Sequence, residues 1–299
     1  MEKTSALKEK RIVITGASMG IGKAVAIALS SKGASVLINS SGGGKNNTQA
    51  LSDTVSEIRS NGGTASYSCG SVADYNYAGE LIQQCVDNYG GIDGLINIAG
   101  IAEPSGSSIL NIAADDWQQV INVHLNGTFN TCRHAAPLMS AQKHGSIINT
   151  GSHAFQGIYG GTAYAAAKGA INSLSAAIAK DLAEHNVRCN VIMPGAKTRL
   201  SSGEVFEENM RTLHSRGMLD KQRLESALTA LPPEFICAAY EYLISDAASN
   251  ISGQLLSISG RHLGGFAWPQ EKIMAYIDAS EAKPWRLETI AEQYQNFAD

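Results

Sequence analysis

The stretch that decides the fold is residues 11–39, RIVITGASMGIGKAVAIALSSKGASVLIN. It opens with a short apolar run at 11–16, which ends at glycine and predicts a buried strand. Residues 20–32 follow with apolar side chains at helical spacing, and Gly33 ends that helix. Residues 34–39, ASVLIN, predict a second buried strand. A strand, a helix and a strand in this length predict one βαβ unit with parallel strands.

The same alternation continues along the rest of the chain. Further strands are predicted at 64–69, 93–98, 145–151, 187–193 and 254–258, and helices at 74–89, 114–140 and 161–185. Strands that alternate with helices predict a mostly parallel sheet with helices on both faces. We therefore expect an α/β fold built on a doubly wound parallel sheet of about seven strands.

Two segments interrupt this alternation. Residues 196–231 are polar, contain two short helical patterns and follow the carboxyl end of a strand, where open α/β sheets bind ligands. We interpret this segment as a substrate lid, with a surface insertion as the alternative. Residues 264–299 are predicted to be a C-terminal extension, which packs over a neighbour or over the active site, or has no role. The main domain then covers residues 1–263.

Composition narrows the classes of function. A chain of 299 residues with 44% hydrophobic and 17% charged residues is expected to be globular, in one domain. The net charge is −4 without a basic block, so neither nucleic acid nor a membrane surface is expected as a partner. The five cysteines are scattered, without a C-x-x-C pair, which indicates free thiols in a reducing compartment. Without a signal peptide or a span of roughly 20 apolar residues, a cytoplasmic location is expected.

The turn after the first strand indicates a binding site for a dinucleotide. It reads TGASMGIG and places Gly16, Gly20 and Gly22 between a strand and a helix. Glycines in this context allow a tight turn and let the backbone approach a pyrophosphate. The helix that follows offers unsatisfied N–H groups and the positive end of its dipole to the phosphates.

The spacing G-x-x-x-G-x-G, with four later motifs, resembles the short-chain dehydrogenase/reductase family over most of the chain. The motifs are NIAG at 97–100, YAAAK at 164–168, PGAKT at 194–198 and SDAASNISGQ at 245–254. The resemblance implies a Rossmann-type sheet, a nicotinamide cofactor, a small-molecule carbonyl or alcohol substrate and no metal. It also implies a homodimer or homotetramer built on the helix that carries Tyr164, whose small residues suit close helix packing.

The resemblance also implies which residues bind the cofactor. These are Gly16, Ser18, Met19, Gly20, Ile21, Gly22, Asn39, Ser40, Ser41, Ser71, Val72, Asn97, Ala99, Gly100, Tyr164, Lys168, Pro194, Gly195 and Thr198. A carboxylate at the end of the second strand would hold the ribose 2′-OH of NAD, but Asn39-Ser40-Ser41 contains none. The hydroxyls there, with the nearby Lys45, favour NADP, and NAD stays the alternative. Ser71 stands where relatives usually carry an aspartate near the adenine.

Tyr164 and Lys168 are the expected centre of the chemistry. They are four residues apart, so they lie on one face of the predicted helix. Tyrosine is a poor acid or base at neutral pH because its ordinary pKa is about 10. A lysine ammonium nearby favours the phenolate, so we expect the pKa of Tyr164 to be lowered. Tyr164 would then exchange a proton with a carbonyl or alcohol oxygen while hydride moves to or from the nicotinamide.

Ser152 is the candidate for holding the substrate oxygen. It follows the strand at 145–151, and its hydroxyl can stabilise charge that develops on that oxygen. The alternative is a serine that satisfies the N–H of a turn. Relatives most often have one residue more before the tyrosine, so the intervening loop is expected to be shortened. That loop is expected to line the substrate pocket, with Phe155 and Tyr159 as contacts or as residues that pack inward.

His124 departs from the family. HLNGTF at 124–129 matches the pattern N-L-x-G-x-F, so His124 stands where relatives place the asparagine of a catalytic tetrad, which helps hold a water beside the lysine. A histidine can donate and accept hydrogen bonds and can titrate near neutrality. Either His124 serves this relay, in which case His124→Asn shifts the pH profile, or it only packs locally. Asn122 and Asn126 point about 160° away around a helix and are not the missing asparagine.

Together these residues predict an NAD(P)-dependent oxidoreductase that interconverts a secondary alcohol and a ketone. The alternatives are a cofactor-binding sensor or scaffold without turnover, and an epimerase or isomerase that uses its bound cofactor transiently. VHLNG at 123–127, IYG at 158–160 and the tryptophans of the tail resemble the dehydrogenase domain of peroxisomal multifunctional enzymes and bacterial single-domain relatives. This narrower resemblance implies a ketoreductase or hydroxyacyl-type dehydrogenase, with the substrate left open.

Overall fold

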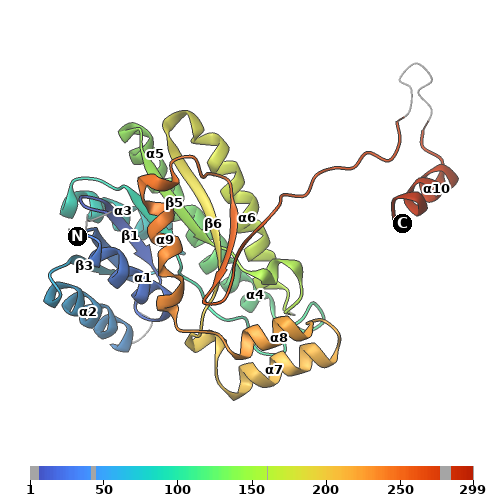
Figure 1. The fold of residues 1–299 in the computed structure, drawn as a ribbon, viewed down its shortest axis with the longest axis horizontal. Coiled ribbons are helices and arrows are strands. Elements are labelled where there is room, and N and C mark those ends of the chain that lie inside the picture. The colour runs from blue at the N-terminus through green and yellow to red at the C-terminus, as the bar shows by residue number, and fades with distance from the viewer. Residues whose placement is uncertain (1–6, 42–44, 160, 277–283, 299) are drawn as a thin grey trace. The chain divides into compact units, whose positions relative to one another are not determined.

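The computed structural model describes residues 7–41, 45–159, 161–276 and 284–298. One sheet of eight strands runs through it. The strands are β1 (Arg11–Thr15), β2 (Ser35–Ser40), β3 (Thr64–Cys69), β4 (Gly94–Asn97), β5 (Gly145–Thr150), β6 (Val187–Gly195), β7 (Leu255–Ser259) and β8 (Leu263–Phe266). Their order is β3-β2-β1-β4-β5-β6-β7-β8, all parallel except β8, which is antiparallel to β7 (Figure 1). The predicted α/β class and doubly wound parallel sheet are confirmed.

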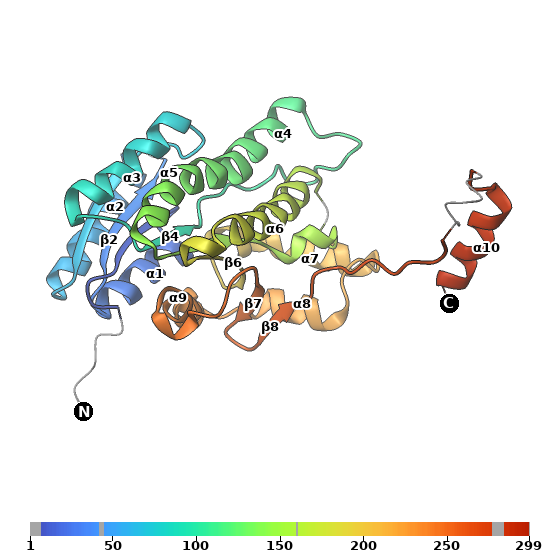
Figure 2. The ribbon, with the colours of Figure 1, turned by 90° about the horizontal axis from the view of Figure 1, so that it is seen from above.

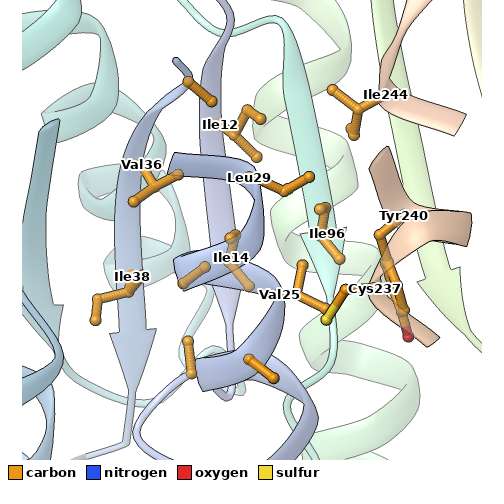
Figure 3. Close-up of a cluster of buried hydrophobic side chains, with 14 of the residues drawn as sticks. Ile12, Ile14, Val25, Leu29, Val36, Ile38, Ile96, Cys237, Tyr240 and Ile244 are labelled. Atoms are coloured by element: carbon orange, nitrogen blue, oxygen red, sulfur yellow. The ribbon is translucent and has the colours of Figure 1, made fainter. Parts of the chain in front are cut away.

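Helices cover both faces of the sheet, as Figure 2 shows. One face carries α1 (Gly20–Ser31), α2 (Lys45–Ser60) and α9 (Cys237–Ile244). The other face carries α3 (Tyr75–Tyr89), α5 (Gly127–Gln142) and α6 (Ala163–Asp181). Figure 3 shows the core of the first face, where Val25 and Leu29 of α1 lie against strand residues such as Ile14. These buried apolar faces fix the helices on the sheet.

The sequence prediction lacks the strand β8 and three helices, α2, α9 and α10 (Leu287–Ala298). Two of these elements, β8 and α2, show why. β8 is LGGF, and two glycines in a four-residue strand leave almost no side-chain alternation to detect. α2 is KNNTQALSDTVSEIRS, in which only a few apolar residues mark the buried side of the helix. Both elements form because neighbouring parts of the chain provide a surface for them, which local sequence does not report.

The predicted helix at 114–140 is not a continuous α-helix. It consists of α4 (Ala114–Ile121), a π-helical turn at Asn122–Asn126, and α5. A π-helical turn inserts an extra residue into the helical repeat and is frequent at functional sites. His124 lies in the middle of this turn.

The interrupting segments differ from each other in structure. Residues 196–231 form α7 (Glu204–Ser215) and α8 (Lys221–Leu228), which share a small apolar core around Met210 and Leu213. The compact unit that holds the sheet ends at Phe266, because β8 extends it beyond the boundary predicted at 263. Residues 267–299 form a second unit with α10 (Leu287–Ala298). Among the residues described, no helix has both the length and the apolar composition that a membrane crossing requires.

A buried carboxylate joins the amino end of β1 to that of β4. Asp93 is 5% exposed and accepts hydrogen bonds from the Arg11 backbone at 2.8 Å and from Arg11 Nε at 2.6 Å. His144 Nε2 bonds its other oxygen. Burial raises the pKa of Asp93, but the bonds from Arg11 and His144 outweigh it, and the net pKa lies below the ordinary value. This interaction therefore stabilises the fold above the ordinary aspartate pKa and is lost as pH falls.

We expect Asp93→Ala to lower the free energy of unfolding by about 3 kcal/mol at pH 7, because it removes the buried acceptor that Arg11 and His144 share. Urea unfolding measures this loss, and the gap from the wild type should narrow toward pH 3. Asp246→Ala is the matched control, since its carboxylate pairs with Lys10 but is 89% exposed. That variant should lose less than about 1 kcal/mol. Equal losses in both variants would contradict the stabilising role of the buried pair.

Candidate active site

The glycine turn lies against the loop that follows β4. Gly16 has φ +68, and a Cβ there would be 2.7 Å from the Ala99 Cα. Gly20 begins α1, and a Cβ on it would be 3.6 Å from the Thr198 methyl. The Met19 side chain makes no capping hydrogen bond, so it does not compete for the N–H groups of the first turn of α1. These N–H groups can bind a phosphate. We call the space beside Gly16 and Gly20 the glycine cradle, and a residue larger than glycine would fill it.

The end of β2 carries hydroxyls in place of a carboxylate. Ser18 Oγ donates to Ser40 Oγ at 3.2 Å, and both side chains are buried. Asn39 Nδ2 donates to the Gly70 carbonyl at 3.0 Å and to Tyr77 Oη at 2.9 Å. The Asn39 amide nitrogen therefore joins β2 to the end of β3. Ser41 is exposed, and the side chain of Lys45 lies outside the described residues.

The segment after β3 uses its polar groups locally. Ser71 Oγ accepts from the Ala73 N–H at 3.3 Å and so shapes the turn before α3. Val72 is buried, and a Cβ on Gly127 would lie 2.7 Å from it, so Val72 packs against the start of α5. Its carbonyl accepts from Asn130 Nδ2 at 2.9 Å. Contact of Ser71 and Val72 with a cofactor stays a prediction.

Asn97 braces the centre of the sheet. Its Nδ2 donates to Asn149 Oδ1 at 2.9 Å, and its Oδ1 accepts from Thr131 Oγ1 at 2.8 Å. The amide thus connects β4 to β5 and α5. Pro194 and Gly195 end β6, where they pair with β7.

Tyr164 and Lys168 lie together at the start of α6. Lys168 Nζ is 5.6 Å from the centre of the Tyr164 ring and donates to the Thr150 carbonyl at 2.7 Å. Burial lowers the pKa of Lys168 to about 7. Tyr164 keeps part of its surface exposed, yet burial raises its pKa, and a hydrogen bond with Ser152 offsets only part of this. The lowered pKa predicted for Tyr164 is wrong, because burial of the phenol outweighs the hydrogen bond with Ser152.

Ser152 has the turn role that the sequence offered as one alternative, and its contact with a substrate oxygen stays a prediction. It precedes the 3-10 turn at 153–156, and its Oγ accepts from the Ala154 N–H at 3.1 Å. The same hydroxyl bonds Tyr164. A hydroxyl has one donor and two acceptor positions, so one serine can shape the turn and still address an oxygen beside Tyr164.

His124 is buried beside Tyr164. Its ring lies perpendicular to the Tyr164 ring, with 5.1 Å between their centres, and the side chain is 3% exposed. Nε2 is 2.8 Å from the Ile101 carbonyl oxygen and 3.1 Å from the Ile101 N–H, so the tautomer decides which bond forms. Nδ1 has no hydrogen-bond partner within the described part of the chain. A Cβ on Gly100 would lie 2.4 Å from His124 Cε1, so only glycine leaves room for this ring.

Burial and, as a smaller cause, the charge of Lys168 together lower the pKa of His124 to about 3. The expectation that His124 titrates near neutrality is therefore wrong. Asn126 Nδ2 donates to Asn122 Oδ1 at 2.9 Å, so these two asparagines bond to each other. They do not substitute for His124, as expected from their angular position.

The two predicted substrate contacts pack in different directions. Phe155 lies edge-on to Phe266 of β8, with 5.3 Å between ring centres, and joins an apolar cluster of β6 and β7. Tyr159 joins the small core of α7 and α8 with Met210 and Leu213. The shortened loop thus connects Ser152 to the predicted lid. Contact of Phe155 or Tyr159 with a substrate stays a prediction.

Sequence reasoning missed two residues that hold this site together. The Thr150 carbonyl is the acceptor for Lys168, and backbone acceptors leave no mark in a side-chain pattern. Glu103 lies 61 positions before Tyr164 and accepts a hydrogen bond from its backbone N–H at 2.8 Å. A carboxylate in a loop of Pro, Gly and Ser residues gives no local signal of such a distant contact. The positive φ of Gly161 beside it is equally invisible in sequence.

The chain is similar to known dehydrogenases along most of its length. Residues 10–207 match the sequence profile of the family described as short chain dehydrogenase. A 3-oxoacyl-[acyl-carrier-protein] reductase from Thermotoga maritima is 33% identical over 85% of this chain and 98% of that protein. The peroxisomal hydratase-dehydrogenase-epimerase of Saccharomyces cerevisiae is 31% identical over 98% of this chain, which spans 30% of that longer protein.

Solved structures agree with these sequence matches. The crystal structure of a short chain dehydrogenase from Mycobacterium avium has a TM-score of 0.79 and 29% identity. The similarity covers 97% of this chain and 95% of that one.

We expect the His124 imidazole to stay neutral between pH 5 and 9, because burial disfavours its cation. NMR of the histidine ring protons would measure this, with His124→Asn used to assign the His124 signals. Free histidine added to the same sample serves as the internal reference, since its imidazole titrates near pH 6.5. A His124 signal that titrates near neutrality would contradict the burial argument.

Proposed function

This chain belongs to the short-chain dehydrogenase family, so it is an NAD(P)-dependent oxidoreductase that acts on CH–OH donors, and we propose that it interconverts a secondary alcohol and a ketone. The observation that carries the proposal is the placement of Ser152, Tyr164 and Lys168 together at the carboxyl end of β5. The substrate we propose is an acyl thioester with oxygen at its third carbon. Support for this class comes from relatives named as 3-oxoacyl-[acyl-carrier-protein] reductases.

The residues present fit the nicotinamide nucleotide that the family binds. The cradle at Gly16 and Gly20 and the amino end of α1 would hold its phosphates, and Thr198 would lie beside them. Lys168 would bind the ribose, as the resemblance implies. When bound, the nicotinamide supplies or accepts hydride.

Side chains of the protein then carry out the proton transfer. Ser152 Oγ donates a hydrogen bond to the substrate carbonyl oxygen and stabilises the negative charge that develops there. Tyr164 transfers its phenolic proton to that oxygen, which becomes the alcohol. Lys168, close to the ring that this leaves as a phenolate, stabilises the negative charge. In the reverse direction Tyr164 accepts the proton.

The pKa of Tyr164 suits the role of a proton donor. Because burial raises it, Tyr164 carries its proton at neutral pH and is prepared to act as an acid. A carbonyl substrate needs such a donor, whereas an alcohol needs the phenolate. We therefore propose Tyr164 as the proton donor whenever the enzyme reduces a ketone.

We propose NADP as the preferred cofactor, with NAD as the alternative. The support is the neutral pair of Ser18 and Ser40, at the position where a carboxylate would repel a 2′-phosphate and bind a 2′-OH. Hydroxyls can donate to phosphate oxygens without charge repulsion.

His124 is proposed to act in the proton relay as a neutral hydrogen-bonding group. Its Nε2 is committed to Ile101, and Nδ1 is the ring atom without a protein partner in the described residues. We further propose that α7 and α8 form the substrate lid, since Tyr159 connects their core to the loop after Ser152.

Two alternatives to the dehydrogenase can be separated from it by experiment. A cofactor-binding sensor would retain the glycine cradle without turnover, and the changed tetrad position at His124 favours it. An epimerase or isomerase would form product without net consumption of NADPH. A panel of 3-oxoacyl thioesters and simple ketones, assayed for both NADPH oxidation and product, separates these alternatives from the dehydrogenase.

We expect Tyr164→Phe to lower kcat about 1,000-fold on the best substrate of that panel, because it removes the proton donor and spares the ring. NADPH affinity should change little, and fluorescence titration measures it. Phe266→Leu is a control that alters an aromatic contact outside the proton path. Turnover close to the wild type in Tyr164→Phe would remove Tyr164 from the mechanism.

We expect Ser40→Asp to weaken NADPH binding about 100-fold and to improve NADH binding, because a carboxylate repels the 2′-phosphate and bonds the 2′-OH. Titration of both nucleotides against wild type and variant measures the switch. Ser41→Asp, at the neighbouring exposed position, tests whether the effect depends on the end of β2. A wild type that binds NADH more tightly than NADPH would overturn the NADP proposal.

A further inference from the structure

The first turn of the catalytic helix is capped from a distant part of the chain. Thr162 at the N-cap of α6 makes no side-chain capping bond. Instead, Glu103 Oε1 accepts from the N–H groups of Thr162 at 2.9 Å and Ala163 at 3.3 Å. Glu103 Oε2 accepts from the Tyr164 N–H at 2.8 Å. Three N–H groups that a helix leaves without internal partners are thus satisfied by one carboxylate.

The surroundings of Glu103 are shaped to hold this carboxylate. Ser107 Oγ donates to Oε1 at 2.6 Å from the same loop. Gly161 has φ +73, and a Cβ there would lie 2.7 Å from Oε2, so only glycine admits the contact at this position. Burial raises the pKa of Glu103, but the hydrogen bonds from Ser107 and the backbone outweigh it, and the net pKa is lowered. The carboxylate is therefore charged at neutral pH and complements the positive end of the helix dipole.

The same loop holds the other side of the site. Ile101, two residues before Glu103, provides the backbone partner of His124 Nε2. Gly100 leaves the room that the His124 ring occupies. The segment 100–107, which begins at the last residue of the NIAG motif, therefore contacts both His124 and the turn that carries Tyr164. The rings of these two residues lie 5.1 Å apart.

We propose that Glu103 is a positioning residue for the reaction, which acts by fixing the first turn of α6 and with it the hydroxyl of Tyr164. Tyr164 is the second residue of α6, within the part of a helix that frays when its N–H groups lack partners. Without Glu103 the Tyr164 side chain would move relative to Ser152 and Lys168. A displacement of about 1 Å at a reacting group can cost about 100-fold in rate.

The proposal rests on the proposed function, so its test includes a measurement that needs no turnover. Glu103→Ala and Glu103→Gln are compared with the wild type and with Asp74→Ala. Asp74 is a matched control because it caps α3, where it accepts from the Asn76 N–H at 2.8 Å and the Tyr77 N–H at 3.0 Å. Amide hydrogen exchange by mass spectrometry follows both helix ends. Steady-state kinetics with NADPH and the best 3-oxoacyl thioester give kcat and KM, and fluorescence titration gives NADPH affinity.

In Glu103→Ala, we expect faster exchange at residues 162–164 and a kcat lowered between about 10-fold and 100-fold. KM and NADPH affinity should change only a few-fold, because the groups that bind the nucleotide lie elsewhere. Glu103→Gln keeps one acceptor oxygen and should restore part of kcat, which also covers the case in which the alanine variant folds poorly. Asp74→Ala should exchange faster at residues 76–77 and keep the wild-type kcat.

A wild-type kcat in Glu103→Ala, despite faster exchange at 162–164, would show that the carboxylate only stabilises the helix and would overturn the proposal. Unchanged exchange at 162–164 in both Glu103 variants would overturn it as well. If the wild type turns over no substrate of the panel while exchange responds as expected, the proposed function fails but the capping of α6 by Glu103 stands.

Discussion

The burial of Lys168 is the constraint on which the candidate active site depends. An ammonium taken out of water needs hydrogen-bond partners, and the Thr150 carbonyl provides one at 2.7 Å. That bond requires the start of α6 to lie at the carboxyl end of β5, which places Tyr164 beside Ser152. The parallel sheet makes this possible, because all strand ends that carry site residues meet at one edge. The contact between Lys168 and the end of β5 thus also determines where Tyr164 lies.

The parts of the fold that sequence predicted are those with a local signature. The glycine turn, the apolar strands and the spacing of Tyr164 and Lys168 each depend on residues within a few positions of one another, so periodicity and turn chemistry reveal them. β8 and α2 were not predicted, because glycines in β8 and polar residues in α2 hide the periodicity of their apolar side chains. The role of Glu103 was not predicted, because it contacts backbone N–H groups as far as 61 residues away in the sequence. No side-chain pattern encodes such a contact.

The sequence failed to predict the protonation states of the site residues for a different reason. Sequence spacing says which groups are neighbours, but it does not say how much water remains around them. The lysine was expected to lower the pKa of Tyr164, yet burial raises it and lowers that of Lys168 to about 7. His124 was expected to titrate near neutrality, yet burial brings its pKa to about 3. In all three cases desolvation is the largest cause, and it is a property of the packed fold.

Burial also explains why a histidine can stand in the place of an asparagine. A protonated imidazole beside the ammonium of Lys168 would add a second positive charge to a poorly solvated site, which is unfavourable. With its pKa at about 3, His124 is neutral, and a neutral imidazole presents one N–H donor and one nitrogen acceptor. A side-chain amide offers the same kinds of group, so the exchange keeps hydrogen bonding and adds no charge. The larger ring is accommodated at Gly100, where any side chain would occupy its space. Histidine differs from asparagine most in its ability to carry a positive charge. Because burial keeps the His124 imidazole neutral, the histidine is compatible with an active site of this kind.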